Sequence, residues 1–319
     1  MNVFKKIYLK TKNRNLYDLL KQNKLFEEFN QQYLESCRAQ NLLKYNIDID
    51  NPLSFKHSGN AGDIIYSLPT VYALSKGFPA DIYLHLNQPA KYDEIRGNHP
   101  LKNVMLDKNM FSMLSPLLLS QDGIRECKAY NLDNVHYDLD IIRKAPIKLD
   151  RGNIVRWYFL LFGVTADLSK PWLFVEPDYS FSDYIMIARS AGYHSPGIDY
   201  SFIKKYKKVV FVGIKEEFYE MRKILPSIEY HQVSDFLELA KSIAGSMFII
   251  GNQSFPFSIA EALKVRRALE QFYICPNVNV EGSNAYDFCF QPQFEMIVDK
   301  LYQQDDNGLN KQNDHSDEL

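Results

Sequence analysis

The chain of 319 residues has little cysteine and no long hydrophobic run. Its four cysteines form no Cys-x-x-Cys pair and no zinc-binding spacing, so we expect reduced thiols in a cytoplasmic protein. No apolar run reaches the roughly 18 residues of a membrane-spanning helix. The N-terminal segment lacks the apolar core and cleavage site of a signal peptide, so none is expected. The net charge of −2 gives no global attraction to nucleic acid, which is not expected as a partner.

The two ends of the chain differ in charge. Residues 1–25 hold seven basic residues against the single acid Asp18, and residues 15–45 carry apolar residues at helical spacing. We therefore expect a helical N-terminal extension over residues 1–50. Its basic charge suits either peripheral contact with an anionic membrane surface or a plain solvated face. Residues 303–319 hold five acids and few apolar residues, which predicts a disordered acidic tail.

Between the two ends, short apolar runs typical of buried strands alternate with helical stretches. Strands are expected at 53–55, 81–86, 102–106 and 137–142, and again at 184–188, 208–212 and 247–250. Such alternation predicts parallel βαβ units and open sheets. We expect an α/β protein of two Rossmann-like domains facing a central cleft, over residues 51–175 and 176–302, with a hinge near residues 171–178.

Three expected strands end in a glycine turn that leads into a helix, over residues 58–63, 211–217 and 249–258. Ligands bind at such strand ends in open parallel sheets, and the free N–H groups of the following helices suit phosphate. The first turn matches neither a P-loop nor the dinucleotide fingerprint, and Asp63 would repel a phosphate there. The sequence leaves two roles open for Asp63, a general base or a residue that stabilises the helix N-terminus.

Other charged residues also lie near expected strand ends. Arg143, Lys144 and Arg151 follow the strand expected at 137–142, so they could contact phosphate or an acidic acceptor, or form a solvated surface. Arg189 follows the strand expected at 184–188, where a contact with a donor diphosphate is plausible.

Metal-binding signals are weak in this sequence. Asp138 and Asp140 have the spacing of a metal-binding Asp-x-Asp pair, but they lie in a pattern that fits a plain strand. The histidines have no metal-ligand spacing, and His57 is expected to be an ordinary loop residue. We therefore expect no metal site.

Two segments carry a resemblance to a known family. Residues 62–69 read GDIIYSLP, and residues 239–263 read LAKSIAGSMFIIGNQSFPFSIAEAL. A third and shorter match is Gly213 after a strand, followed by Glu217. Residues 53–302 thereby resemble the heptosyltransferase-type glycosyltransferases of bacterial lipopolysaccharide biosynthesis, which form glycosyltransferase family nine.

This resemblance implies a GT-B fold and a metal-independent, inverting transfer of a sugar without a cofactor. The donor would be a nucleotide-sugar, by family default an ADP-sugar, and the acceptor a glycan or lipid-linked glycan at the inner membrane face. The family's general base corresponds to Asp63. The strand-end positions and the resemblance together give the expected donor-binding residues, which are Arg189, Gly213, Glu217, Gly251, Asn252, Gln253, Ser254 and Ser258. The candidates for acceptor or phosphate contact are Gly62, Arg143, Lys144 and Arg151.

The sequence departs from the family pattern at three positions of the second segment. Gln253 stands where the family has Asp, Phe255 where it has Gly, and Ser258 where it has His. These departures leave two alternatives open beside a glycosyltransferase. One is a catalytically inactive GT-B protein that binds a nucleotide or a partner, and the other is a sugar-nucleotide epimerase.

Overall fold

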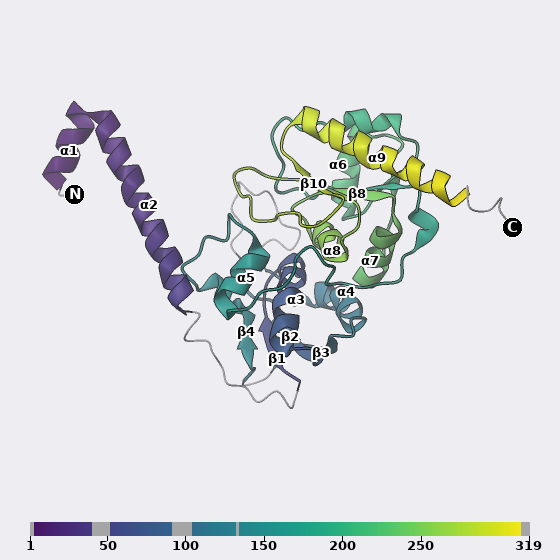
Figure 1. The fold of residues 1–319 in the computed structure, drawn as a ribbon, viewed down its shortest axis with the longest axis horizontal. Coiled ribbons are helices and arrows are strands. Elements are labelled where there is room, and N and C mark those ends of the chain that lie inside the picture. Colours follow the sequence, from purple (N-terminus) through teal and green to yellow (C-terminus); the bar gives the residue numbers. More distant parts are fainter. Residues whose placement is uncertain (1–2, 40–51, 91–103, 132–133, 314–319) are drawn as a thin grey trace.

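The body of the protein contains two parallel β-sheets with helices packed around them (Figure 1). The computed structural model describes residues 3–39, 52–90, 104–131 and 134–313, and it describes side chains there except at 38–39 and 304–313. No described helix has the length and apolar character needed to cross a bilayer.

The first sheet lies in the N-terminal half. Its strands are β1 (Ser54–His57), β2 (Ala80–Leu84), β3 (Ile124–Ala129) and β4 (Tyr137–Asp138), in the order β3-β2-β1-β4. All neighbours are parallel, and Phe55 of β1 lies in register with Ile82 of β2 and Tyr137 of β4. The helices of this half are α3 (Ala61–Ser75), α4 (Lys108–Leu119) and α5 (Ile154–Phe162).

The second sheet lies in the C-terminal half. Its strands are β5 (Ile185–Ala188), β6 (Val209–Phe211), β7 (Glu229–Tyr230), β8 (Phe248–Asn252), β9 (Arg267–Glu270) and β10 (Ala285–Phe288), in the order β10-β9-β8-β5-β6-β7. All neighbours are parallel. The helices are α6 (Lys215–Ile224), α7 (Phe236–Gly245), α8 (Phe255–Leu263) and α9 (Gln291–Asn313).

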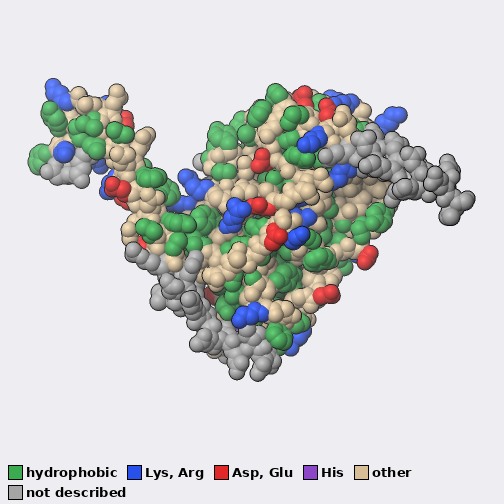
Figure 2. All heavy atoms as spheres, in the orientation of Figure 1, with side chains coloured by type: hydrophobic (Ala, Val, Ile, Leu, Met, Phe, Trp, Pro, Cys, Tyr) green, Lys and Arg blue, Asp and Glu red, His purple; other side chains and the backbone are tan. Residues whose placement is uncertain are grey.

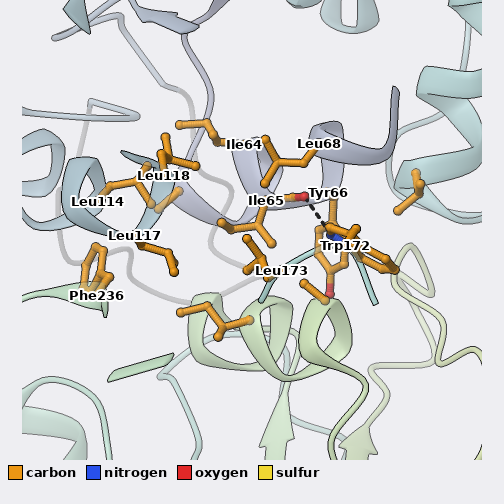
Figure 3. Packing of buried hydrophobic residues seen from close by; sticks show 14 of the residues in the cluster. Ile64, Ile65, Tyr66, Leu68, Leu114, Leu117, Leu118, Trp172, Leu173 and Phe236 are labelled. Carbon is orange, nitrogen blue, oxygen red and sulfur yellow. Dashed lines mark hydrogen bonds between the residues drawn. The ribbon is translucent and has the colours of Figure 1, made fainter. Parts of the chain in front are cut away.

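An apolar layer joins the two halves. Helix α3 packs against α8, and α4 packs against α7. Figure 3 shows Ile64 and Ile65 of α3 in this layer, together with Leu173 of the segment that connects the halves. The indole nitrogen of Trp172 donates to the carbonyl of Ile65 at 3.2 Å, and its backbone amide donates to the carbonyl of Ala262 in α8. The connecting segment therefore fixes α3 and α8 side by side.

The N-terminal extension folds into two helices, as expected for residues 3–39. Helix α1 (Val3–Lys12) and helix α2 (Arg14–Ala39) form a hairpin that projects from the body (Figure 1). The other residues of the expected extension, 1–2 and 40–50, lie outside the described residues. At the opposite end, α9 continues to Asn313 and so runs into the segment expected to be disordered.

Some expected elements differ from the structure. The strand expected at 137–142 ends at Asp138, because the Asp138 carboxylate accepts the Asp140 amide and starts a 3-10 helix over Leu139–Arg143. Of the strand expected at 102–106, residues 102–103 are outside the described residues, and Val104 forms an isolated antiparallel bridge to Pro89. Strands β3, β7, β9 and β10 and helices α4 and α5 were not expected from the pattern.

Candidate active site

The candidate site begins where β1 ends. The chain leaves the sheet at His57, passes through Ser58 and Gly59, and enters α3 at Ala61, so Asp63 lies in the first turn of that helix. The backbone amide of Asn60, the N-cap residue, donates to the Asp63 carboxylate. This contact is one half of a capping box, and it shows that Asp63 does stabilise the helix start.

The first turn of α3 meets the first turn of α8. A Cβ atom built on Gly62 would lie 3.7 Å from Oγ of Ser258 and 3.9 Å from Cα of Phe255. Gly62 therefore lies at the contact between helices from the two halves, beside residues that were expected to bind the donor. Asp63 is the next residue of the same helical turn, and its carboxylate contacts Arg143 of the N-terminal half.

Arg143 holds the Asp63 carboxylate. Its Nη2 atom donates to Oδ2 of Asp63 at 3.0 Å, and its Nη1 atom donates to Oδ1 of Asp140 at 2.8 Å. Asp140 is buried, and the same oxygen also accepts the Ser58 amide at 2.8 Å. The guanidinium thus bridges two carboxylates, and we call Asp63, Arg143 and Asp140 the carboxylate clamp.

Desolvation and Arg143 shift the pKa of Asp63 in opposite directions. Its side chain is 29% exposed, and desolvation raises the pKa of Asp63 above its ordinary value. The charge and hydrogen bond of Arg143 act in the opposite direction and offset part of this rise. A carboxyl group with a raised pKa that keeps an ion-pair partner can accept a proton more readily than an exposed aspartate.

Gly59 makes room for the clamp. A Cβ atom at this position would lie 2.0 Å from Nη2 of Arg143 and 2.5 Å from Cε1 of His57. Both distances are far shorter than any van der Waals contact, so only glycine lets the guanidinium lie over the backbone here.

His57 is buried beside the clamp, contrary to the expectation of an ordinary loop residue. Its Nδ1 atom accepts the Gly59 amide at 2.8 Å, so the proton of the neutral ring is on Nε2, which lies 2.7 Å from Oη of Tyr158. Desolvation, together with the charges of nearby Arg143 and Lys56, lowers the pKa of His57 to about 3. The imidazole is therefore neutral at physiological pH and supports the strand end from within.

The aspartates of the Asp-x-Asp spacing hold cationic side chains. Lys56 donates to Oδ2 of Asp138 at 2.9 Å and lies 3.5 Å from Asp140, which also binds Arg143. Among the described residues, no group of three His, Cys, Asp or Glu side chains is arranged to hold a metal ion.

Two of the basic candidates lie away from the clamp. The side chain of Lys144 is 73% exposed, and its Nζ atom is 3.9 Å from Asp138. Arg151 pairs with its neighbour Asp150 and lies over the ring of Phe29 in α2. Of the three basic residues expected after β4, only Arg143 contacts Asp63.

In the second half, Glu217 orders two loops. Its Oε1 atom accepts the Ala191 amide at 2.9 Å, which ties the start of α6 to the loop after β5. Burial raises the pKa of Glu217, and the hydrogen bonds from the amides of Ala191 and Ile214 oppose that rise. Gly213 precedes this helix with φ of +147°, where a Cβ atom would lie 3.1 Å from Oε2 of Glu217.

Asn252 and Gln253 at the end of β8 are used in loop contacts. Asn252 is fully buried; its amide group donates to the carbonyl oxygens of Ser190 and Gly192, and its Oδ1 accepts the Ser190 amide. Gln253 donates from Nε2 to the carbonyl of Cys275 and to Oδ1 of Asn277, and its Oε1 accepts the Phe272 amide. An aspartate could not make both of the donations that Gln253 makes.

The remaining residues of this segment pack closely. A Cβ atom on Gly251 would lie 3.0 Å from the carbonyl oxygen of Ala188, so glycine allows β8 and β5 to end side by side. Ser258 is fully buried and donates to the carbonyl of Phe255 within α8. Ser254 is the N-cap of α8 but its side chain accepts no hydrogen bond from the helix start, and Pro256 in the first turn has no amide hydrogen to donate.

Arg189 forms a buried ion pair. Its Nε and Nη2 atoms donate to the two oxygens of Glu270 at 2.7 and 2.8 Å, and Glu270 is fully buried. Glu270 also accepts from Oη of Tyr200 and from the Ser195 amide. This network braces the strand ends of the second sheet.

A separate cavity of about 520 Å³ lies beside α5, away from Asp63. Its walls include Tyr33 of α2, Trp157 of α5 and Asn279. None of the residues expected from the sequence to form the site lines it.

No protein-family model and no curated protein sequence matches this chain. Among solved structures, E. coli heptosyltransferase WaaC with ADP-2-deoxy-2-fluoro heptose is similar, with a TM-score of 0.55 at 8% sequence identity, over 78% of this chain and 99% of that chain. E. coli heptosyltransferase WaaC with ADP gives a TM-score of 0.55 at 8% identity, over 79% of this chain and 100% of that chain. At such low identity the likeness shows the fold. The chain has the α/β GT-B fold that its sequence predicts, and in fold it is similar to these heptosyltransferases.

Proposed function

We propose that the protein is a glycosyltransferase that uses a nucleotide-sugar donor and Asp63 as its general base. The observation that carries this proposal is the position of Asp63 in the first turn of α3, the turn in which Gly62 touches the first turn of α8. A transfer between the halves needs a base on one side and a donor on the other, and we assign the base to this turn of α3 and the donor to the start of α8. The GT-B fold, shared with heptosyltransferases solved with ADP and an ADP-sugar analogue, supports the donor class.

In the proposed reaction, the acceptor hydroxyl attacks the anomeric carbon while Asp63 takes its proton. The bond from that carbon to the diphosphate breaks, and the nucleoside diphosphate leaves from the opposite face, so the configuration inverts. The uncapped start of α8 supplies amides for the leaving charge. The acceptor would be a glycan or a lipid-linked glycan, and the step would need neither a metal ion nor a cofactor.

The carboxylate clamp supports the role of Asp63. Arg143 fixes one carboxylate oxygen, and desolvation raises the pKa of the group above that of an exposed aspartate. A fixed carboxylate with a raised pKa loses less orientation freedom and accepts a proton more readily during the reaction.

A second candidate is a protein of the same fold without transferase activity. The contacts of Gln253 and Arg189 favour this candidate. Internal hydrogen bonds use both the nitrogen and the oxygen of the Gln253 side-chain amide, and they use the Nε and Nη2 atoms of Arg189. These residues would then serve loop structure, and the protein would bind a nucleotide or a partner.

A panel of ADP-, GDP-, UDP- and CMP-sugars separates the two candidates. Thermal unfolding with each compound detects binding, since a ligand at 100 times its dissociation constant adds about 2.7 kcal/mol to the free energy of unfolding. Release of the nucleoside diphosphate with a sugar acceptor present, in EDTA, then detects transfer, and NMR of the product gives its configuration. Binding without release in the presence of acceptors would favour the inactive protein, and turnover without any acceptor would indicate an epimerase.

A further inference from the structure

Helix α1 presents an apolar face that nothing in the described part of the chain covers. Val3, Phe4, Ile7 and Tyr8 are 68%, 85%, 57% and 64% exposed. At 3.6 residues per turn, these four positions fall on one face of about 140°. Figure 2 shows hydrophobic and basic side chains together at the end of the projecting hairpin.

This apolar face points away from the partner helix. Leu9 is the buried residue of α1, at 6% exposure, and Tyr17 of α2 is buried at 5%. On the helical wheel, Leu9 lies roughly opposite the centre of the exposed face. An amphipathic helix of a soluble hairpin normally turns its apolar stripe toward its neighbour. Here α1 meets α2 through Leu9 and through Lys10, whose Nζ atom lies over the ring of Tyr17, and its broader apolar face stays outward.

Lysines border the exposed face on both sides. Helix α1 contains Lys5, Lys6, Lys10 and Lys12 and has no acidic residue. Lys5 and Lys12 fall beyond Tyr8 on the wheel, and Lys6 and Lys10 fall beyond Val3 on the other side. Apolar and aromatic side chains between two rows of lysine are the pattern of a helix that lies in the surface plane of an anionic bilayer.

We propose that α1 docks on an anionic lipid surface, with Phe4 and Ile7 inserted between the lipids and the flanking lysines on the headgroups. Charge favours lipid over a second copy of this chain, since two α1 helices would place four lysines of one against four of the other. Each lysine near an anionic surface contributes about 1 kcal/mol, and this contribution falls with salt. The docking concerns a surface apart from Asp63 and does not depend on sugar transfer.

Vesicle flotation with the full chain tests this docking. The vesicles contain phosphatidylcholine and phosphatidylglycerol at about 7:3, or phosphatidylcholine alone. We expect binding to the anionic vesicles that weakens with added salt, and much weaker binding to the neutral vesicles. The double variant Phe4→Ser and Ile7→Ser should lose binding at least about tenfold, because apolar burial drives insertion. The variant Lys6→Gln with Lys12→Gln should bind more weakly and show a smaller salt dependence, because two of the four lysines of α1 remain.

The matched control is Phe174→Ser, which removes an exposed ring of the body (65% exposed) and should bind vesicles like the unaltered chain. Circular dichroism of each variant checks that the fold is kept. Absence of vesicle binding, or equal binding by the Phe4 and Ile7 variant, would overturn the proposal. A dimer in solution that the same variant dissociates would also overturn it and assign the face to a second copy. Vesicle binding needs no sugar donor or acceptor. A negative flotation result therefore counts against lipid docking only, and a negative transfer assay counts against the proposed glycosyltransferase only.

Discussion

The Nη2 atom of Arg143 donates to Oδ2 of Asp63 over 3.0 Å, and so ties the 3-10 helix after β4 to the first turn of α3. The two residues are far apart in the sequence and come from neighbouring strand ends of one sheet. Asp140 holds the other side of the same guanidinium. The clamp therefore orients Asp63 and also lowers its pKa against the effect of desolvation, and each of its parts can be tested separately.

Replacement of Arg143 by methionine should move the acid limb of the pH profile of kcat to higher pH. Arg143 lowers the pKa of Asp63, so without it desolvation acts with less opposition and the base stays protonated to higher pH. An adjacent opposite charge is worth about 1–3 pKa units. Arg143→Lys should give a smaller shift, because it keeps the charge.

The control for this series is Lys144→Met, which removes an exposed neighbouring charge that does not contact Asp63. Its pH profile should match that of the unaltered protein. An Arg143→Met protein with an intact fold and an unmoved acid limb would show that the group titrating in kcat is not Asp63.

Gly59→Ala and Gly62→Ala should have opposite effects on stability. The methyl group at position 59 would collide with Arg143 and His57, and we expect a loss of about 1–3 kcal/mol in the free energy of unfolding. At position 62 the nearest atoms are 3.7 Å away, in ordinary contact, so helix propensity should give a gain of up to about 1 kcal/mol. Urea denaturation of the two variants measures both. Equal losses at both positions would contradict the packing described for Gly59.

His57 should make the protein less stable as the pH falls below about 6.5. Its folded-state pKa of about 3 lies below the ordinary value of 6.5, so the unfolded chain binds a proton first. Between these two values, each pH unit downward should cost on the order of 1 kcal/mol. The raised pKa of Asp63 has the opposite effect on stability as the pH falls. The contribution of His57 is therefore measured by comparing the unaltered protein with a variant that lacks the imidazole.

In His57→Asn, which removes the titrating ring, the fall in unfolding free energy between about pH 6.5 and pH 5 should be shallower than in the unaltered protein. Denaturation at the two pH values gives the slope. Identical slopes in the two proteins would refute the assignment of a buried neutral imidazole.

Gln253→Asp should destabilise the protein and should not increase turnover. The change restores the residue type of the family pattern, but a carboxylate here would face the carbonyl of Cys275 and Oδ1 of Asn277, which are both acceptors. A buried group left without its partner costs about 1–3 kcal/mol. Thermal unfolding measures the loss, with Gln232→Asp at an exposed position as the control. A gain in turnover without loss of stability would mean that Gln253 lies in the donor site rather than in loop contacts.

The sequence was most informative where structure is local. The apolar runs near 184–188 and 208–212 predicted β5 and β6 within a residue or two, because buried parallel strands are continuous hydrophobic runs. Asp235 is the N-cap of α7, and its carboxylate accepts the amides of Leu237 and Glu238. Glu238 bonds to the Ser234 amide, one residue before the position that a capping box requires.

Contacts between distant residues could not be read from the sequence. Arg143 was a candidate for phosphate contact, and its role as the partner of Asp63 depends on strand order in the sheet. The burial of His57 depends on Tyr158, a residue of α5, which the pattern did not reveal. The bend at Asp138 also escaped prediction, since residues 137–142 alternate like a strand while the Asp138 side chain starts a 3-10 helix.

General-base catalysis by Asp63 is tested most directly by the transfer rate of Asp63→Asn, with a donor and acceptor identified in the sugar panel. Asparagine keeps the size of the side chain and can still accept from Arg143, but it cannot take the acceptor proton. Asp138→Asn is the matched control, because Asp138 binds Lys56 and caps the 3-10 helix without a contact to Asp63. We predict that Asp63→Asn lowers kcat by about 10²–10⁴ with donor affinity and fold unchanged, while Asp138→Asn keeps most of its activity. An Asp63→Asn protein that transfers sugar at the original rate would contradict the role assigned to this carboxylate.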